Sequence, residues 1–171
     1  YDCNSRISRL LAHLDTAPAA ADDEPVLIPA RDVDTGTPGL LARIEEGGVG
    51  ILTINRPDRA NALGSDLTPF IRHMLHLWKD EDDVRVLIIT GAGKYFTAGG
   101  NMQGSDDVTI TPPPLPPAPD GWKPDPEDEH GNFKQMQRTL TGAIWQFPKP
   151  TIAAIPGAAA GLGVSLALST D

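Results

Sequence analysis

Residues 149–163 read KPTIAAIPGAAAGLG, and VSLALSTD follows them to Asp171. The stretch from Thr151 to Thr170 carries no charge and has the length of a membrane-spanning helix. Pro156 and Gly157, however, divide it into a strand-like first half and a glycine-rich second half. A buried strand, a turn and a buried helix therefore explain this stretch better than a membrane span.

A strand, a glycine turn and a helix are also the parts of a dinucleotide site. Here Gly157, Gly161 and Gly163 are spaced GxxxGxG, whereas the dinucleotide fingerprint is GxGxxG. The segment GAGKYFTAGG (91–100) contains a Gly-Lys pair but lacks the rest of a phosphate-binding P-loop. Both glycine patterns are therefore weak indications of a nucleotide-binding module.

A third interpretation relies on backbone amides. The first amides of a helix have no acceptor within the helix and carry partial positive charge. Two such amides that converge from two loops can stabilise an enolate or a tetrahedral oxyanion, and glycine lets the oxygen approach closely. The chain has two such junctions, FTAGGNM (96–102) after one expected strand and GAAAGLG (157–163) after the next.

The residues before the first junction predict strand, strand, helix and strand. LLARIEEGGVGILTINRP (40–57) is typical of two strands joined by a glycine hairpin. SDLTPFIRHMLHLWKD (65–80) has its apolar residues at helical spacing, with Ser65 or Asp66 as the N-terminal cap. VRVLIIT (84–90) is short, apolar and followed by glycine, which is typical of a buried parallel strand. These elements indicate an α/β fold.

Two regions fall outside this pattern. Residues 1–39 are expected to form an N-terminal extension, with a short amphipathic helix at 5–14 and then a linker rich in Ala, Pro and Asp. Residues 105–130 hold eight prolines and many acids, so we expect an inserted surface loop there. A helix is expected again at 131–147. The chain is thus expected to hold one core, residues 40–171, interrupted by the 105–130 insertion.

Composition and charge limit the classes of function. The formal net charge is −9, and no basic stripe offsets it, which argues against nucleic acid. The single cysteine, Cys3, makes no internal disulfide or multi-cysteine metal site, and the first residues lack the apolar segment of a secretory signal. His73 and His76 have helical spacing but no third ligand, so no metal site is expected. We expect a cytoplasmic protein that binds neither nucleic acid nor membrane.

Taken in order, five stretches resemble the enoyl-CoA hydratase/isomerase, or crotonase, family. They are GILTINRPDRANAL (50–63), DDVRVLIITGAGKYFTAGGNM (82–102), the helix before Lys149, KPTIAAIPGAAAGLG (149–163) and VSLALSTD (164–171). The resemblance covers residues 40–104 and 131–171. It implies a ββα superhelix, present here without its C-terminal part, that binds an acyl-coenzyme A thioester and assembles as a homotrimer or hexamer.

The resemblance also implies a site. In that family two backbone amides polarise the thioester carbonyl, and by motif these amides fall at Gly100 and Leu162. The segment RANAL (59–63) resembles the turn that lines the coenzyme A site, with Ala60 and Ala62 near the nucleotide and pantetheine. The other substrate contacts that the resemblance implies are Arg59, Ala98, Gly99, Asn101, Met102 and Gly161. Coenzyme A belongs to the substrate, so no separate cofactor is implied.

Ser165 departs from the family pattern. Hydratases of the family use two glutamates to position and deprotonate water; the first position is Ser165 here, and the second lies beyond Asp171. A serine hydroxyl cannot act as a general base unaided. Hydration, double-bond isomerisation and other enolate reactions with one downstream acid therefore remain open, as does a non-catalytic acyl-CoA-binding protein. For Asp171 itself, we expect a structural role as the partner of an arginine.

Overall fold

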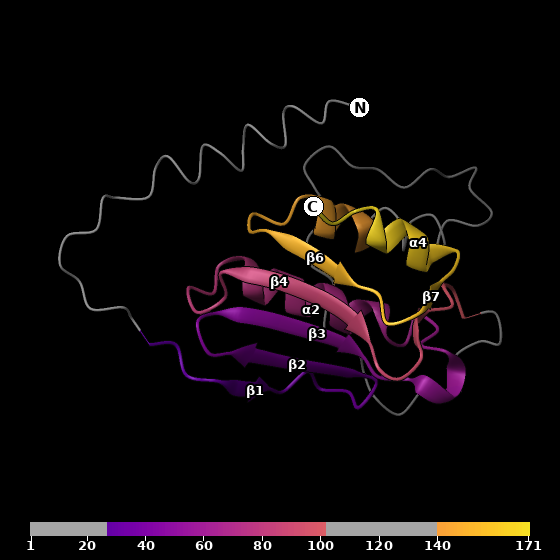
Figure 1. Cartoon of the computed structure of the whole chain (residues 1–171), viewed down its shortest axis with the longest axis horizontal. Helices are drawn as coiled ribbons and strands as arrows, with labels where there is room; N and C mark the ends of the chain where they lie inside the picture. The colour runs from indigo at the N-terminus through magenta and orange to yellow at the C-terminus, as the bar shows by residue number, and fades with distance from the viewer. Residues whose placement is uncertain (1–26, 102–139) are drawn as a thin grey trace.

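The structure is a computed structural model that describes residues 27–101 and 140–171 (Figure 1). Its main feature is a five-stranded sheet in the order β1-β2-β3-β4-β6. Neighbours β1, β2 and β3 are antiparallel, whereas β3, β4 and β6 run parallel to one another. The strands are β1 (Arg31–Val33), β2 (Leu40–Glu45), β3 (Val49–Ile54), β4 (Val86–Gly91) and β6 (Thr151–Ala154).

The predicted hairpin joins β2 to β3. Glu45 pairs with Val49 at its closed end, and Gly47 and Gly48 between them have φ values of 84° and 92°. Glycine adopts this left-handed region with little steric cost, so the chain can reverse there. The hairpin prediction is confirmed.

The sheet extends into the range that was expected to be a linker. Arg31–Val33 form β1, which pairs with β2, and Ile28 is buried in the core with 3% of its surface exposed. The Arg43 guanidinium of β2 binds the Asp32 carboxylate of β1 at 2.8 Å. Pairing and packing thus begin before residue 40.

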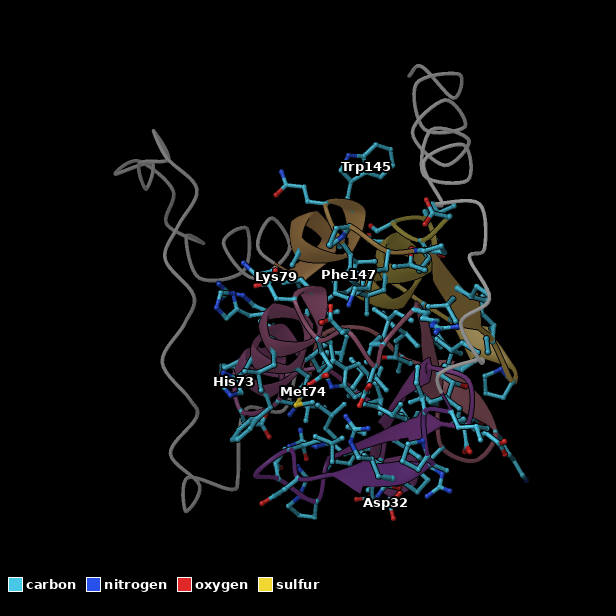
Figure 2. The ribbon with its side chains drawn as sticks, turned by 90° about the vertical axis from the view of Figure 1, so that its left-hand side faces the viewer. Asp32, His73, Met74, Lys79, Trp145 and Phe147 are labelled. Carbon is cyan, nitrogen blue, oxygen red and sulfur yellow. The ribbon has the colours of Figure 1, made fainter. Side chains whose placement is uncertain are left out.

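One side of the sheet carries the hydrophobic core. Residues on β3 and β4 alternate between buried and half-buried, so β4 is parallel as expected but has only one fully buried face. The helix α2 (Thr68–Lys79) covers that face from behind the sheet in Figure 1. In Figure 2, Met74 lies on the inner side of α2 and His73 on its outer side. Residues 140–145 are helical, and Leu140 and Ile144 belong to the same core.

The predicted cap of α2 is wrong. The cap position falls at Leu67, and no side chain makes a capping hydrogen bond. The Leu67 and Thr68 amides instead donate to the Gly64 carbonyl, at 3.1 and 2.9 Å. The Asp66 carboxylate binds Arg56 Nη2 at 2.6 Å, so it ties the start of the helix to the segment after β3.

The uncharged stretch 151–170 divides as the glycine pattern predicts. After β6 come the short strand β7 (Ala158–Ala159) and the helix α4 (Leu162–Ala167). The strand in this stretch was expected to be buried, but Ile152 of β6 is 50% exposed. None of the helices in the described ranges is long and apolar enough to cross a membrane.

Asp171 lies beyond the end of α4, not on it, because the helix has only six residues. Its carboxylate accepts hydrogen bonds from the amide and the hydroxyl of Thr151, both at 3.0 Å. Asp171 therefore fastens the segment after α4 to the first residue of β6. Its role is structural, with Thr151 as a partner.

Candidate functional site

The two predicted junctions lie side by side. The strand β5 (Tyr95–Thr97) pairs in parallel with β7, with Tyr95 opposite Ala158 and Thr97 opposite Ala159. Just beyond this pair, the Ala160 amide donates to the Thr97 carbonyl at 3.0 Å. A second, two-stranded sheet thus joins two loops that are distant in sequence.

Close approach of the two backbones explains two of the glycines. A Cβ built on Gly99, whose φ is 92°, would lie 2.6 Å from the Ala160 carbonyl oxygen and 3.0 Å from the Leu162 amide nitrogen. A Cβ on Gly163 would lie 2.6 Å from the γ-methyl carbon of Thr97. Any side chain at either glycine would therefore push the junctions apart.

The Gly100 amide points away from Leu63, the residue to which Gly99 and Asn101 are hydrogen-bonded. The Leu63 amide donates to the Gly99 carbonyl at 2.7 Å, and the Asn101 amide donates to the Leu63 carbonyl at 2.6 Å. In such a parallel bridge the residue between the two bonded groups directs its own amide to the other side. Within 27–101 and 140–171, the Gly100 amide donates to no acceptor and is available to a ligand.

The Leu162 amide is the corresponding donor at the second junction. The next three amides of the chain donate to carbonyls of the preceding turn at 2.8, 3.1 and 3.4 Å. The Leu162 amide itself donates to no carbonyl in the described parts of the chain. Its side chain is 2% exposed, so core packing holds the backbone in place.

A turn at residues 59–63 supports the first junction. Ala60 and Asn61 both have left-handed backbone conformations, with φ values of 50° and 58°. The Asn61 side chain is fully buried, and its Nδ2 donates to the carbonyls of Ala92 and Tyr95 at 2.9 and 2.7 Å. Its Oδ1 accepts from the Arg56 amide at 2.8 Å.

Sequence reasoning named Ala60 and Ala62 in this turn but not Asn61. Asparagine is the residue, after glycine, that most readily adopts the left-handed conformation, and its side chain readily binds local backbone groups. Those preferences were a usable signal. They gave no indication of Ala92 and Tyr95, which lie far along the chain.

The remaining predicted contacts gather around the same junctions. Gly99 is buried, and Ala98 and Gly161 are exposed; Ala60, Ala62, Gly100 and Asn101 are half-buried. Arg59 is exposed and lies 3.6 Å from the carboxylate of its neighbour Asp58. Met102 and the 105–130 insertion lie outside the described residues.

Ser165 occupies α4, one turn after the Leu162 amide, and is half-buried. Its carbonyl accepts a hydrogen bond from the Ser169 hydroxyl at 2.6 Å. Its own hydroxyl makes no hydrogen bond to the described chain. No group of three or more side chains there could hold a metal ion. Within the described residues, the candidate groups at the two junctions are therefore the backbone amides of Gly100 and Leu162 and the Ser165 hydroxyl.

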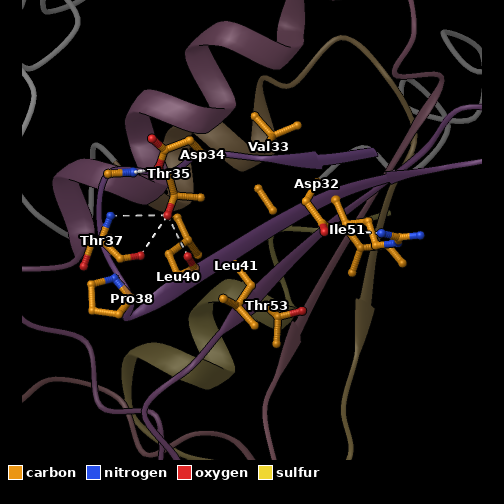
Figure 3. A pocket seen from close by; sticks show the side chains of 13 residues that line it. Asp32, Val33, Asp34, Thr35, Thr37, Pro38, Leu40, Leu41, Ile51 and Thr53 are labelled. Carbon is orange, nitrogen blue, oxygen red and sulfur yellow. Dashed lines mark hydrogen bonds and ion pairs between the residues drawn. The ribbon is translucent and has the colours of Figure 1, made fainter. Parts of the chain in front are cut away.

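A separate groove of about 790 Å³ lies on the side of β1, β2 and β3 (Figure 3). Leu41, Ile51 and Thr53 line it, together with the loop that follows β1. The Thr35 hydroxyl donates to the Leu40 carbonyl at 2.6 Å and so fixes that loop. Neither junction contributes to its lining, so the groove is distinct from the candidate site.

Comparison with known proteins agrees with this geometry. The family model for enoyl-CoA hydratase/isomerase matches residues 49–171. The chain is 33% identical over 132 residues to 1,2-epoxyphenylacetyl-CoA isomerase of Escherichia coli K12, which covers 77% of this chain and 45% of that protein. It is 31% identical over 146 residues to the mitochondrial enoyl-CoA hydratase domain-containing protein 2 of Mus musculus, with coverages of 83% and 44%.

Solved structures give the same result. The enoyl-CoA hydratase of Bacillus anthracis superposes on this chain with a TM-score of 0.62 at 28% identity, over 78% of this chain and 45% of that one. The chain therefore spans less than half the length of the relatives that it matches. With its mixed sheet, its covering helices and its paired glycine junctions, the chain belongs to the enoyl-CoA hydratase/isomerase family and has part of the crotonase fold.

Proposed function

We propose that this protein is an acyl-CoA enzyme of the hydratase/isomerase type, which stabilises a thioester enolate with the amides of Gly100 and Leu162. One observation carries the proposal: the two junctions meet, and within the described residues the Gly100 amide of the first and the Leu162 amide of the second have no acceptor. The family to which the chain belongs supports an acyl-CoA thioester as the substrate.

The chemistry follows from where charge develops. In isomerisation, removal of a proton from the carbon next to the thioester carbonyl moves negative charge onto the carbonyl oxygen. In hydration, addition of water to the β-carbon of a 2-enoyl thioester moves charge onto the same oxygen, and a proton then adds to the α-carbon. Two fixed amide donors bind that oxygen more strongly as its charge grows, so they lower the barrier more than they stabilise the substrate. Removal of a single such donor from an enzyme typically lowers kcat by about 10²–10³-fold.

Ser165 bears on which enolate reaction follows. Its hydroxyl can donate or accept a hydrogen bond, to substrate or to water, but does not take up a proton as a base near neutral pH. Hydration would then depend on a single acid supplied elsewhere. Double-bond isomerisation also needs only one group that moves a proton between two carbons, so it is an equal part of the proposal.

The wider proposal concerns the assembled protein. Coenzyme A enters with the substrate, and no metal or redox cofactor takes part. The active form is a homotrimer or hexamer in the cytoplasm, and it binds neither nucleic acid nor membrane. Its oligomeric state is measurable by sedimentation of the chain with and without acyl-CoA.

The decisive experiment follows the absorbance of the conjugated enoyl thioester. A short 2-enoyl-CoA loses this absorbance on hydration, whereas a 3-enoyl-CoA gains it on isomerisation. Calorimetric titration with a saturated acyl-CoA and with free coenzyme A measures binding separately. Acyl-CoA that binds no better than free coenzyme A, with no turnover of either enoyl substrate, would contradict the proposal.

A non-catalytic acyl-CoA-binding protein is the second candidate, and the hydroxyl in place of a carboxylate at Ser165 favours it. Such a protein would keep both amides and lose the acid. Tight acyl-CoA binding with no change in absorbance for either enoyl substrate would identify it.

A further inference from the structure

We infer that Asn61 is a positioning residue that sets the direction of the Gly100 amide. The inference rests on the proposed function of that amide, and it concerns a side chain that touches no part of the proposed oxyanion site directly. Asn61 acts through the turn that contains it, as the contacts of its neighbours show.

Both polar atoms of the Asn61 side chain are hydrogen-bonded to the backbone. It is completely buried, and its carboxamide makes three hydrogen bonds, two as donor and one as acceptor. The acceptors are the carbonyls of Ala92, just after β4, and of Tyr95, the first residue of β5. A Cβ on Gly91 would lie 2.7 Å from Asn61 Nδ2, so the amide fits only because that residue is glycine.

The backbone on either side of Asn61 is hydrogen-bonded to residues before and after Gly100. The Ala60 carbonyl accepts from the Ala98 amide at 2.9 Å, and Leu63 exchanges hydrogen bonds with Gly99 and Asn101 at 2.7 and 2.6 Å. Residues 98, 99 and 101 are therefore all held by the turn, and only the Gly100 amide remains for a ligand. Movement of the turn would rotate that amide.

The turn needs the side-chain hydrogen bonds of Asn61 because its backbone conformation is unfavourable. Two successive residues other than glycine have left-handed φ values, 50° at Ala60 and 58° at Asn61. Such conformations persist only where surrounding contacts impose them. The side-chain hydrogen bonds of Asn61 are among these contacts: two fix the turn against Ala92 and Tyr95, and the third binds the Arg56 amide. The Asn61 amide also donates to the Arg56 carbonyl at 2.8 Å.

Two substitutions separate the contribution of the Asn61 side-chain hydrogen bonds from that of its left-handed backbone conformation. Asn61→Asp keeps an acceptor for the Arg56 amide and a residue that tolerates the left-handed backbone, but it places a carboxylate oxygen against two carbonyls. Asn61→Gly keeps the backbone freedom and removes all three hydrogen bonds. Asn55→Asp is the matched control, because the Asn55 side chain makes one exposed hydrogen bond, to the Pro38 carbonyl at 3.0 Å.

The first readout is the absorption spectrum of a bound 3-aryl-2-enoyl-CoA, whose band moves to longer wavelength when amides polarise its carbonyl. We expect Asn61→Asp and Asn61→Gly to lose most of this shift while still binding the thioester. Turnover should fall about 100-fold in kcat with little change in KM, because the carbonyl is bound but misaligned. Asn55→Asp should keep the shift and the rate.

The second readout is amide hydrogen exchange of residues 98–101 in the full chain without ligand. Faster exchange there in the Asn61 variants, with the β2–β3 hairpin unchanged, supports the inference. Unchanged exchange, or an unchanged spectral shift in a variant that binds the thioester, overturns it. If the wild-type chain itself shows no spectral shift, the proposed function fails instead, and exchange alone decides whether Asn61 positions residues 98–101. A variant that unfolds by circular dichroism is judged through the other Asn61 substitution.

Discussion

Gly99 lies between the two junctions, with the Ala160 carbonyl oxygen only 2.6 Å from where a Cβ would be. Its positive φ of 92° adds a second reason for glycine. At the scale of single residues, the candidate site is therefore built by the absence of side chains as much as by functional groups. Ser165 contributes a side chain, and Leu162 contributes a backbone amide.

Gly99→Ala should destabilise the protein and weaken thioester binding. The new methyl group meets the Ala160 carbonyl, and alanine is strained at this φ, so the free energy of unfolding should fall by about 2 kcal/mol or more. Denaturant unfolding measures the change. Gly142→Ala is the control, because nothing lies within 4 Å of a Cβ there, and a helical alanine should stabilise by about 0.5–1 kcal/mol. Equal effects of both substitutions would contradict the argument.

Ser165→Glu tests the missing acid. A carboxylate one turn from the Leu162 amide would supply the group that serine lacks, so hydration of a short 2-enoyl-CoA should accelerate by about 10²-fold. Stopped-flow absorbance measures the rate. Thr170→Glu adds the same charge outside the site and should leave the rate unchanged. Equal rates for wild type and Ser165→Glu would show that Ser165 does not face the reacting carbon.

At the scale of secondary-structure elements, single polar side chains connect the ends of strands and helices. Asp171 joins the segment after α4 to β6, and the Arg56–Asp66 pair joins the segment after β3 to the start of α2. Lys149, just before β6, donates from Nζ to the carbonyls of Trp78 and Glu81 at 2.8 and 2.5 Å. Its ammonium group thereby binds at the C-terminal end of α2, where a positive charge is favourable.

Lys149→Met should loosen the contact between α2 and β6. Loss of two hydrogen bonds from a charged donor should lower the free energy of unfolding by about 1–3 kcal/mol. Urea unfolding measures this difference, and Lys94→Met, at an exposed lysine, should leave stability within about 0.5 kcal/mol of wild type. A similar loss in both variants would show that the effect is one of charge alone.

At the scale of the whole molecule, large apolar side chains are exposed on neighbouring elements near the end of the chain. Ile152 and Ile155 in and after β6, and Val164 and Leu168 in and after α4, are 42–76% exposed. Figure 1 shows β6 and α4 next to each other. Apolar side chains exposed on neighbouring elements are typical of a surface that binds another polypeptide, so we expect such a surface here.

The double variant Ile152→Lys, Leu168→Lys should therefore bind less of an apolar fluorescent dye than wild type and self-associate less. Dye fluorescence and sedimentation velocity measure the two effects. Leu27→Lys is the control, because Leu27 is 77% exposed and precedes Ile28, whose carbonyl accepts a hydrogen bond from Gly47 of the β2–β3 hairpin. A control variant that changes as much as the double variant would argue against a localised surface.

Features that depend on neighbouring residues were predictable from the sequence, whereas features that depend on residues distant in the chain were not. The β2–β3 hairpin and α2 were predictable because local spacing and turn glycines decide them. The cap of α2 and the strand β1 were missed because Arg56 and β2, which decide them, lie outside the local pattern. The site divides in the same way: motif placed Gly100 and Leu162 in the converging junctions, whereas the side-chain hydrogen bonds of Asn61 depend on Ala92 and Tyr95.

The pairing of β5 with β7 has a consequence for how such a chain can change in evolution. Asn101 is hydrogen-bonded to Leu63, and Leu140 is fully buried, so the polypeptide between these positions leaves and returns at two firmly held points. The entropy of closing such a connection grows only logarithmically, by about 0.6 kcal/mol for each doubling of its length. Changes in the length of this connection therefore cost little stability, and members of the family can differ in length there while the β5–β7 pairing keeps the two junctions in register.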